Sequence, residues 1–444
     1  MDKIALSNTE EISLTKNNKP DGGTHAVVIG SGLAGLSAAR VLAGHFDRVT
    51  LVDRDRLDAG VEFRPGAPQA RHAHSLLPQG QAILEQQFPG LVHELLANGA
   101  VAIDQGREAV FFDHGTWRTL RDQSGGLITS SSRALLENTL YRRLCSDPRI
   151  RIWQGLEATG LGVDAAGQRV TGVWIRERSK TGAAGVYLAA GLVVDASGRG
   201  SRAAHWLGSL GYPTPRESVV DAHTGYASRL YQVPDGFSDG WKKLYISPEP
   251  PDSTRGGIIL PLEGGRWHVT LVGMAGDFPP TGEAGFLAFA HSLPSGRLYD
   301  AIREATPLTR PFGYRSTENR QRNYDRLPQY LEGFLVLGDA VATLNPVYML
   351  GMTAAALGTQ ALDEILREQF QTAPAGESSG LAGAFQKRLS QATARLWRLA
   401  IAADLRWPET TATQVNSPAA QPILAPAIFM RQLPEPSILS EAVS

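Results

Sequence analysis

Short apolar runs bounded by glycine alternate with amphipathic stretches along much of the chain. The first run, residues 26–29, is rich in β-branched residues, and an alanine- and leucine-rich stretch at 33–43 follows it and stops at Gly44. A second apolar run, residues 49–52, ends on Asp53. Short continuous apolar runs are typical of parallel strands buried on both faces. The pattern predicts a strand, a helix and a second strand that open a doubly wound α/β domain.

The same pattern predicts the remaining elements. Further strands are expected at 101–103, 109–112, 116–120, 150–154, 170–176, 191–194 and 333–338. Helices are expected to begin near Gln79 and to cover 130–145, where Ser131 or Ser132 can cap the helix, 351–366 and 380–405. Between 204 and 326 alternating strands at 225–232, 257–261 and 266–273, with a short helix at 286–293, predict a mostly antiparallel layer.

The distribution of these predicted strands and helices along the chain predicts the domain organisation. Residues 24–104, 125–203 and 327–370 are expected to form one discontinuous Rossmann-like domain. A β-sheet domain that binds substrate is expected from 105–124 and 204–326. Residues 371–444 are interpreted as a helical segment and tail, with a flexible linker at 371–380, and residues 1–23 as a disordered leader. The predicted fold is therefore α/β with an added antiparallel layer and a helical C-terminus.

Composition narrows the class of protein. A chain of 444 residues with 42% hydrophobic and 20% charged residues is typical of a soluble protein of two domains. The formal net charge of -1 gives no basic surface for nucleic acid, so none is expected as a partner. The single cysteine, Cys145, fits a cytoplasmic location, and no apolar run is long enough to predict a membrane span.

The glycines after the first predicted strand carry the clearest chemical signal. Gly30, Gly32 and Gly35 have the dinucleotide-binding spacing: a tight turn, close approach to a pyrophosphate, and close packing of the next helix. The residues between them, Ser31, Leu33 and Ala34, would present backbone amides and the positive helix end to phosphate. Asp53 stands where a carboxylate meets a ribose hydroxyl, which favours FAD or NAD over NADP despite the adjacent Arg54.

Three later segments complete a cofactor site. Arg133 lies at the start of a predicted helix, within reach of a phosphate. Asp195 and Gly198 follow a predicted strand in the sequence DASGRGSR. Gly338 and Asp339 end another strand, and a loop containing Pro346 leads to a helix that begins at Gly351 and Met352. The positive end of that helix suits a reduced flavin, whose pyrimidine end is negative.

Arg71, His72 and His74 form a fourth group. Alternating histidines sometimes bind metal, but no carboxylate or cysteine cluster joins these, and no metal site is predicted. A role for Arg71 or His74 beside an anionic flavin is the functional interpretation, and histidines bonded to local backbone are the alternative.

From residue 24 to residue 407 the sequence resembles the FAD-dependent monooxygenases of the para-hydroxybenzoate hydroxylase type. The resemblance implies that Asp53 holds the adenosine ribose and that Gly338 and Asp339 hold the ribityl chain. It also implies that the segment from Asp195 to Arg202 contacts flavin and nicotinamide, and that Arg133 is the helix arginine of that family.

Within that group the sequence is most similar to epoxidases of polyether-ionophore pathways, such as those of monensin and lasalocid. The shared stretches are PQARHAHSLL, VVDASGRGSR, GRWHVTLVG and GDAVATLNPVYMLGMTAAA, with ADLRWPET as a further match. Met349 and Leu350 depart from the pattern, because a glycine and a polar residue usually stand there. These residues adjoin the flavin position, so the departure bears on substrate shape and oxygen handling.

The resemblance implies transfer of one oxygen atom from a C4a-hydroperoxyflavin to an apolar natural-product intermediate, by epoxidation or hydroxylation, with O₂ as co-substrate. The sequence contains no second glycine fingerprint, so NAD(P)H is expected to reduce the flavin directly or through a separate flavin reductase. Arg71, His74 and Pro346 are the predicted catalytic residues. A flavin-dependent reductase (saturase), a halogenase and a non-redox FAD-containing cyclase remain alternatives. The segment WKKLYISP at 241–248 matches the halogenase pattern poorly.

Overall fold

The computed structural model describes residues 24–56, 63, 66, 68–119, 126–179, 185–372 and 379–415. The predicted leader lies outside these residues, as do most of the predicted linker and of the tail. Within the described part of the chain, no helix is both long and apolar enough to cross a membrane.

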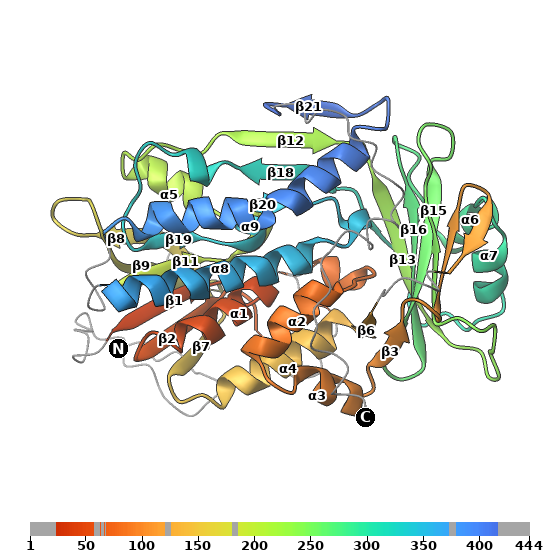
Figure 1. Ribbon diagram of the computed structural model, residues 1–444, viewed down its shortest axis with the longest axis horizontal. Helices are drawn as coiled ribbons and strands as arrows, with labels where there is room; N and C mark the ends of the chain where they lie inside the picture. Colours follow the sequence, from red (N-terminus) through yellow and green to blue (C-terminus); the bar gives the residue numbers. More distant parts are fainter. Residues whose placement is uncertain are drawn as a thin grey trace.

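A five-stranded parallel sheet forms the centre of the molecule (Figure 1). Its order is β19-β11-β1-β2-β7, and every neighbouring pair is parallel. The strands are β1 (His25–Ile29), β2 (Arg48–Asp53), β7 (Ile150–Gln154), β11 (Leu192–Asp195) and β19 (Phe334–Val336). Residues of β1, β2, β11 and β19 are almost entirely buried, as their continuous apolar runs predict.

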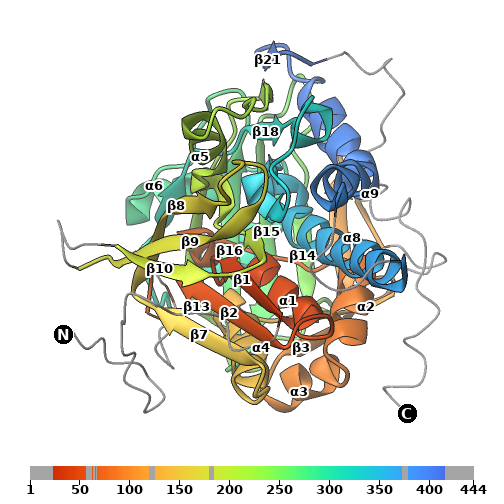
Figure 2. The same cartoon turned by 90° about the vertical axis from the view of Figure 1, so that its left-hand side faces the viewer.

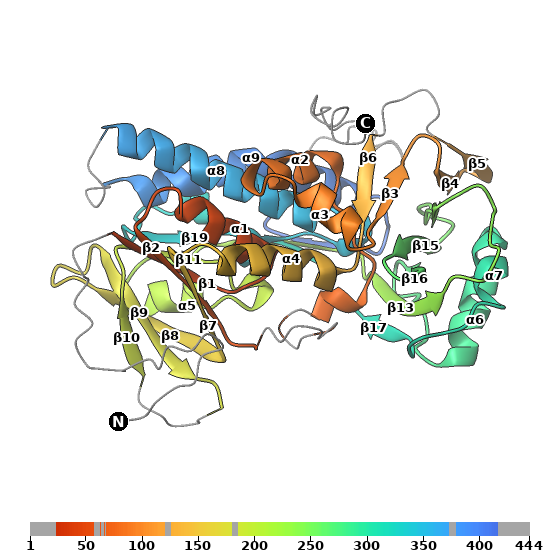
Figure 3. The same ribbon diagram turned by 90° about the horizontal axis from the view of Figure 1, so that it is seen from below.

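Different layers cover the two faces of this sheet. Helices α1 (Leu33–Leu42), α8 (Gly351–Thr372) and α9 (Leu381–Asp404) pack on one another and on one face. On the opposite face lies the antiparallel sheet of β8 (Leu156–Val163), β9 (Val170–Glu177) and β10 (Val186–Ala189), as Figures 2 and 3 show. The carboxyl ends of the parallel strands remain uncovered by these layers.

A seven-stranded sheet stands at those carboxyl ends, in the order β17-β13-β16-β15-β14-β4-β5. It contains β4 (Ala109–Asp113), β5 (Thr116–Arg118), β13 (Gly225–Gln232), β14 (Lys243–Ile246), β15 (Arg255–Leu262), β16 (Arg266–Gly273) and β17 (Phe312–Tyr314). All its pairs are antiparallel except β14 with β4. Helices α6 (Glu283–His291) and α7 (Arg297–Ile302) pack on its outer face.

The remaining elements connect these layers. A four-stranded sheet has the order β20-β18-β12-β21, and β3 pairs with β6. These strands are β12 (Glu217–Asp221), β18 (Asn319–Arg322), β20 (Ala342–Thr343), β21 (Thr411–Thr413), β3 (Val101–Asp104) and β6 (Leu127–Ser130). The other helices are α2 (Pro78–Gln87), α3 (Leu91–Ala97), α4 (Arg133–Cys145) and α5 (Ala203–Ser209).

The predicted fold class is confirmed, and the strands β4 and β5 pair as a hairpin across His114 and Gly115. The helix expected at 351–366 is longer and reaches Thr372, because Ile365 and Leu366 stay buried against neighbouring helices and Phe370 packs on His45 and Phe46. Strands β12 and β18 are absent from the sequence prediction. Their polar sequences give no apolar run, and they are strands because they pair with each other. The division into domains stays a prediction.

Candidate functional site

Two adjoining cavities lie where the parallel sheet meets the seven-stranded sheet. The larger has a volume of about 300 Å³ and the smaller about 150 Å³. The residues that line both cavities are Gly32, Arg54, Gly66, Gln69, Arg133, Ala196, Ser197, Gly198 and Gly200. The two cavities therefore share one wall and extend from Asp53 at one end to Tyr245 and Ile258 of the far sheet at the other.

The glycine loop between β1 and α1 forms the floor of the smaller cavity. Gly30 has φ +100°, and a Cβ there would lie 2.6 Å from the carbonyl oxygen of Ala196. A Cβ on Gly35 would overlap the carbonyl oxygen of Gly30. Around Gly32, in contrast, a Cβ would meet no atom within 4 Å. Gly30 and Gly35 are therefore fixed by packing, whereas Gly32 faces open space that a ligand can occupy.

Asp53 holds this loop in place from the end of β2. Its Oδ2 accepts hydrogen bonds from the backbone N and the Oγ of Ser31, both at 2.6 Å. Its Oδ1 accepts a hydrogen bond from the backbone N of Asp55 at 2.7 Å. Asp53 and Ser31 line the smaller cavity, and the adjacent Arg54 lines both.

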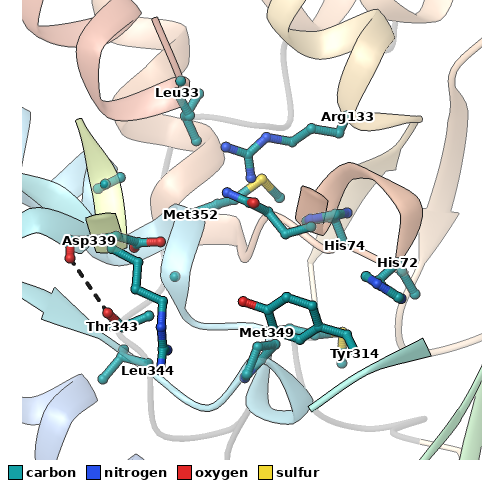
Figure 4. A pocket seen from close by; sticks show the side chains of 18 of the residues that line it. Leu33, His72, His74, Arg133, Tyr314, Asp339, Thr343, Leu344, Met349 and Met352 are labelled. Carbon is teal, nitrogen blue, oxygen red and sulfur yellow. Dashed lines mark hydrogen bonds between the residues drawn. The ribbon is translucent and has the colours of Figure 1, made fainter. Parts of the chain in front are cut away.

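Arg133 brings positive charge to the shared wall from the first turn of α4. Ser132 caps that helix by accepting a hydrogen bond from the backbone N of Leu135 at 3.0 Å, as predicted. The Nε of Arg133 donates to Oε1 of Glu137 at 2.6 Å, and both side chains are nearly buried. In Figure 4 the guanidinium points into the cavity between Leu33 and Met352. Because Glu137 fixes it there, Arg133 presents a preorganised cation to the cavity.

Asp339 faces the cavity from a short 3₁₀ turn that follows β19. Burial raises the pKa of its carboxyl, and the charges of Arg133 and Arg199 oppose that shift. The preceding Gly338 has φ +66°, and a Cβ there would lie 2.8 Å from the Cβ of Ala34. Gly338 thus lets the end of β19 approach the start of α1 closely, which places Asp339 beside the glycine loop.

The segment between β20 and α8 forms the next part of the wall. Pro346, Met349, Gly351 and Met352 all line the larger cavity. Met349 has φ +55°, the left-handed conformation that glycine adopts more readily. At the position where this sequence departs from the resembled epoxidases, the backbone therefore has a conformation that suits glycine, although the residue is methionine.

The inner face of the seven-stranded sheet closes the larger cavity. Tyr226, Tyr245 and Ile258 line it. Leu230, Leu260, Phe286 and Phe289 from the same region are buried but do not line the cavity. Side chains alternate between the two faces of a strand, so Ile258 faces the cavity while Ile259 packs with Phe286 and Phe289 under α6.

The two histidines of the predicted catalytic group line this cavity as neutral side chains. Burial lowers the pKa of His72 to about 3, with further lowering by His268 and Arg71. Burial and the charge of Arg133 also lower the pKa of His74. His72 Nδ1 is hydrogen-bonded to Ser228 Oγ at 2.8 Å, and that oxygen to Thr270 Oγ1 at 2.7 Å. Both histidines therefore act as hydrogen-bonding groups without positive charge.

Four predicted site residues line neither cavity: Gly35, Arg71, Asp195 and Gly338. Arg71 does not line either cavity, and its guanidinium lies 5.0 Å from the ring centroid of Phe312 and 5.7 Å from that of Phe63. Asp195 is fully buried under the wall, where it accepts hydrogen bonds from Ser197 N at 2.9 Å and Ser201 Oγ at 2.6 Å. Asp195 therefore shapes the turn whose residues, Ser197 and Gly198 among them, reach the cavity.

Sequence reasoning missed several wall residues: Gln69, Arg199, Thr270, Tyr314 and Thr343. Arg199 could have been predicted, because it belongs to the DASGRGSR motif. In the structure it forms an ion pair with Glu318. Tyr314 stacks on Tyr226 with ring centroids 5.5 Å apart, and Figure 4 shows it next to Met349. The short strand that carries Tyr314 has no pattern that marks it in the sequence.

Several solved structures with this architecture are flavoproteins. The chain superimposes on the probable FAD-dependent monooxygenase PqsL of Pseudomonas aeruginosa with a TM-score of 0.63, covering 86% of this chain and 96% of PqsL at 16% identity. For the flavin-dependent brominase Bmp2 the TM-score is 0.62, over 85% and 86% of the two chains at 15% identity. For HpxO of Klebsiella pneumoniae, solved with FAD, it is 0.60, over 86% and 89% at 19% identity.

The chain thus has the fold shared by FAD-dependent monooxygenases and flavin-dependent halogenases. No protein-family model matches the sequence. It is 32% identical over 405 residues to Protein Rv3254 of Mycobacterium tuberculosis, across 87% of this chain and 81% of that protein. The chain belongs to the same family as Protein Rv3254.

Proposed function

We propose that this protein is an FAD-dependent monooxygenase that transfers one oxygen atom of O₂ to a small, largely apolar molecule, by epoxidation or hydroxylation. The observation that carries the proposal is the continuity of the two cavities. One end has the features of a dinucleotide site, and the other end is walled by aromatic and aliphatic side chains of a separate sheet.

The residues at the first end fit FAD. Gly32 leaves a hollow at the positive end of α1, and Arg133 adds a fixed cation beside it, which together suit a pyrophosphate. Asp53 borders the smaller cavity, where a ribose hydroxyl would meet it. Asp339 and Gly338 would hold the ribityl chain, and Gly351 and Met352 at the start of α8 would face the flavin ring. Ser31, Leu33, Ala34, Arg54 and Gly198 complete the proposed site.

Bound FAD, once reduced, would supply the electrons that activate O₂ for oxygen transfer. The chain would contribute a dry and shaped surface beside it. Tyr245, Ile258 and Met349 would exclude water and orient the substrate. His72 and His74, being neutral, would add hydrogen bonds without attracting an anion. Epoxidation and many hydroxylations depend more on such positioning than on a dedicated acid or base.

The electron donor is proposed to be NAD(P)H, either directly or through a separate flavin reductase. A halogenase would need a lysine that faces its substrate tunnel. Lys243, the buried lysine of the 241–248 segment, does not meet this requirement. Its Nζ donates to Oε1 of Gln105 at 3.3 Å, and Lys243 does not line either cavity. An apolar natural-product intermediate, and a place in secondary metabolism, follow from the sequence resemblance and are part of the proposal.

The first test is whether the purified protein binds FAD, measured by visible absorbance and by titration of the protein with FAD. Asp339→Ala should weaken binding by about tenfold or more, the size of one hydrogen bond to a charged group. A wild-type protein that stays colourless with excess FAD would overturn the proposal.

The second test separates the reaction classes. The FAD-loaded protein is reduced with NADPH without oxygen and then mixed with O₂, while flavin reoxidation, oxygen uptake and peroxide release are followed. We expect rapid reoxidation with oxygen uptake, and incorporation of ¹⁸O from ¹⁸O₂ once an alkene substrate is supplied. Substrate reduction without oxygen uptake would show a saturase instead, and turnover with the flavin kept oxidised would show a cyclase.

A further inference from the structure

Asp404, the last residue of α9, lies in a buried polar cluster that adjoins the cavity wall. Figure 1 shows α9 ending near β12 and β18, and the side chain of Asp404 is fully buried. Its Oδ1 accepts hydrogen bonds from Tyr348 Oη at 2.6 Å and Asn345 Nδ2 at 3.0 Å. Its Oδ2 accepts a hydrogen bond from Asn319 Nδ2 at 2.6 Å. One carboxyl therefore receives three donors from two other parts of the chain.

Two of these donors flank the same short turn, the 3₁₀ helix Pro346–Tyr348. Asn345 caps its start, because Oδ1 of Asn345 accepts a hydrogen bond from the backbone N of Val347 at 3.2 Å. The backbone N of Asn345 also donates to Oδ1 of Asn319 at 2.7 Å. Tyr348 ends the turn. Asp404 thus holds both ends of a four-residue segment.

That segment forms part of the wall of the larger cavity. Leu344, Pro346, Val347 and Met349 line the cavity, while Asn345 is buried behind it. Met349 follows Tyr348 directly and has φ +55°. A left-handed conformation costs a residue other than glycine about 1 kcal/mol or more. Contacts from outside the segment must therefore hold it in this shape. The packing of Met349 against the cluster that contains Phe111 and Tyr245 is one such contact, and the hydrogen bond from Tyr348 to Asp404 is another.

We propose that Asp404 is a positioning residue, which sets the shape of residues 345–349 by holding Asn345 and Tyr348, and thereby the cavity wall that faces the flavin ring. The effect of this wall on a flavin ring rests on the proposed function. The claim that Asp404 fixes residues 345–349 rests only on the contacts described above.

The hold is stronger when the carboxyl of Asp404 is ionised. The amide oxygens of Asn345 and Asn319 are already engaged with backbone N–H groups, so their NH₂ groups must face Asp404. A protonated carboxyl has one acceptor position fewer, it can donate its proton only to Tyr348 Oη by reversing that hydrogen bond, and its remaining hydrogen bonds lose the charge that strengthens them. The segment is therefore expected to be held when Asp404 is charged and loosened when Asp404 is protonated.

The surroundings place this change near neutral pH. Burial raises the pKa of Asp404 to about 7, while hydrogen bonds from Tyr348, Asn345 and Asn319 oppose the shift and the charge of Asp221 on β12 adds to it. Arg406, just beyond α9, acts on Tyr348, whose own pKa is raised by burial and by Asp404. Removing the Tyr348 hydroxyl should raise the pKa of Asp404 further, because that hydrogen bond stabilises the charged form.

The test measures the segment directly. Amide hydrogen exchange of peptides covering 344–350 is followed from pH 6 to pH 8.5, with correction for the intrinsic rate at each pH, in protein with and without added FAD. Wild-type protein should gain protection as the pH rises, with a midpoint near 7. Tyr348→Phe, which keeps the ring, should move that midpoint up by about one pH unit, the size of one charged hydrogen bond. Asp404→Asn, which cannot ionise, should abolish the transition.

A matched control changes a carboxyl elsewhere on the same helix pair. Glu368→Gln breaks the exposed ion pair between α8 and Arg388 on α9 and should leave the midpoint unchanged. The absorbance of bound FAD serves as the second readout and should shift with the same midpoint. A wild-type segment whose protection is independent of pH, or a midpoint unaffected by Tyr348→Phe, would overturn the inference. An exchange transition without any FAD binding would instead support the hold on the segment and reject the proposed function.

Discussion

Gly35 packs so closely against Gly30 that a Cβ on Gly35 would overlap the carbonyl oxygen of Gly30. Gly35→Ala must therefore push α1 away from β1 in the centre of the molecule. We expect the free energy of unfolding to fall by about 1–3 kcal/mol, the usual cost of overpacking. Urea unfolding measures this loss, and unchanged stability would show that α1 does not pack on the loop as described.

Gly32→Ala should have the opposite effects: little change in stability and a large change in FAD binding. Gly32 has φ -69°, and a Cβ at this position would meet no atom within 4 Å, so alanine should change the free energy of unfolding by less than about 0.5 kcal/mol. The methyl group would instead fill the hollow proposed for the pyrophosphate. FAD titration should show a dissociation constant raised at least tenfold. Normal FAD affinity would argue against a pyrophosphate at this loop.

Arg133 and Glu137 form a nearly buried ion pair whose two roles can be separated. Arg133→Met alone removes the cation that pairs with Glu137, and should lower the free energy of unfolding by up to about 3 kcal/mol. Adding Glu137→Leu should restore most of that stability, because an apolar pair of similar size is tolerated. FAD affinity should stay low in the double variant. Recovery of FAD binding together with stability would mean that Arg133 is only structural.

Three buried histidines should make the protein unstable in acid. Burial lowers the pKa of His25 to about 4, that of His268 to about 4 and that of His72 to about 3. Below the unfolded pKa of about 6.5 the unfolded chain binds protons that the folded chain does not. Their contribution is therefore complete above about pH 6.5 and is lost as the pH falls toward their folded pKa values. Unfolding free energies between pH 8 and pH 5 measure this fall.

His25 offers the control for this prediction, because it lies away from the cavities and bonds to Ala189 O and Thr50 Oγ1. His25→Gln removes one titrating group, so the slope of unfolding free energy against pH should decrease by about one proton below pH 6. An unchanged slope would mean that His25 is not held neutral. Asp404 acts in the opposite direction, since its raised pKa costs stability as the pH rises from about 4 to about 7.

Tyr226 carries a buried hydroxyl that has no hydrogen-bond partner in the described structure, although the side chain lines the larger cavity. Tyr226→Phe removes an unsatisfied polar group, so the free energy of unfolding should stay equal or rise by up to about 1 kcal/mol. If the hydroxyl bonds to substrate, KM should rise while kcat changes little. Steady-state kinetics with an accepted substrate decide this, and an unchanged KM would exclude such contact.

The part of the site around the glycine loop, Asp53 and Asp339 was predictable because each of its segments has a local sequence signature. Gly30, Gly32 and Gly35 have a recognisable spacing, of which Gly30 and Gly35 are required by close packing, and Asp53 follows at the distance set by one helix and one strand. Gly338 could be recognised because it ends an apolar run just before an acidic residue. The central sheet and its helices followed from the same apolar runs.

The substrate end was less predictable. Both faces of β15 are apolar, so sequence could not tell that Ile258 faces the cavity and Ile259 the outer helices. Arg71 was predicted as a site residue together with His74, yet its guanidinium packs on Phe312. Asn345 and Asp404 lie in two of the stretches shared with the resembled epoxidases, but these stretches do not show that the two side chains, 59 residues apart, contact each other. Such relationships depend on tertiary packing, which no local pattern encodes.

The late position of β19, α8 and α9 in the chain has a consequence for biosynthesis. During translation the glycine loop emerges from the ribosome roughly three hundred residues before Asp339 and Gly351, which line the opposite side of the larger cavity. The nascent chain therefore exposes a partly formed cavity for most of its synthesis. A truncation that removes α8 and α9 should leave β1, α1 and β2 without the wall that faces them, and under the proposed function such a chain would not retain FAD.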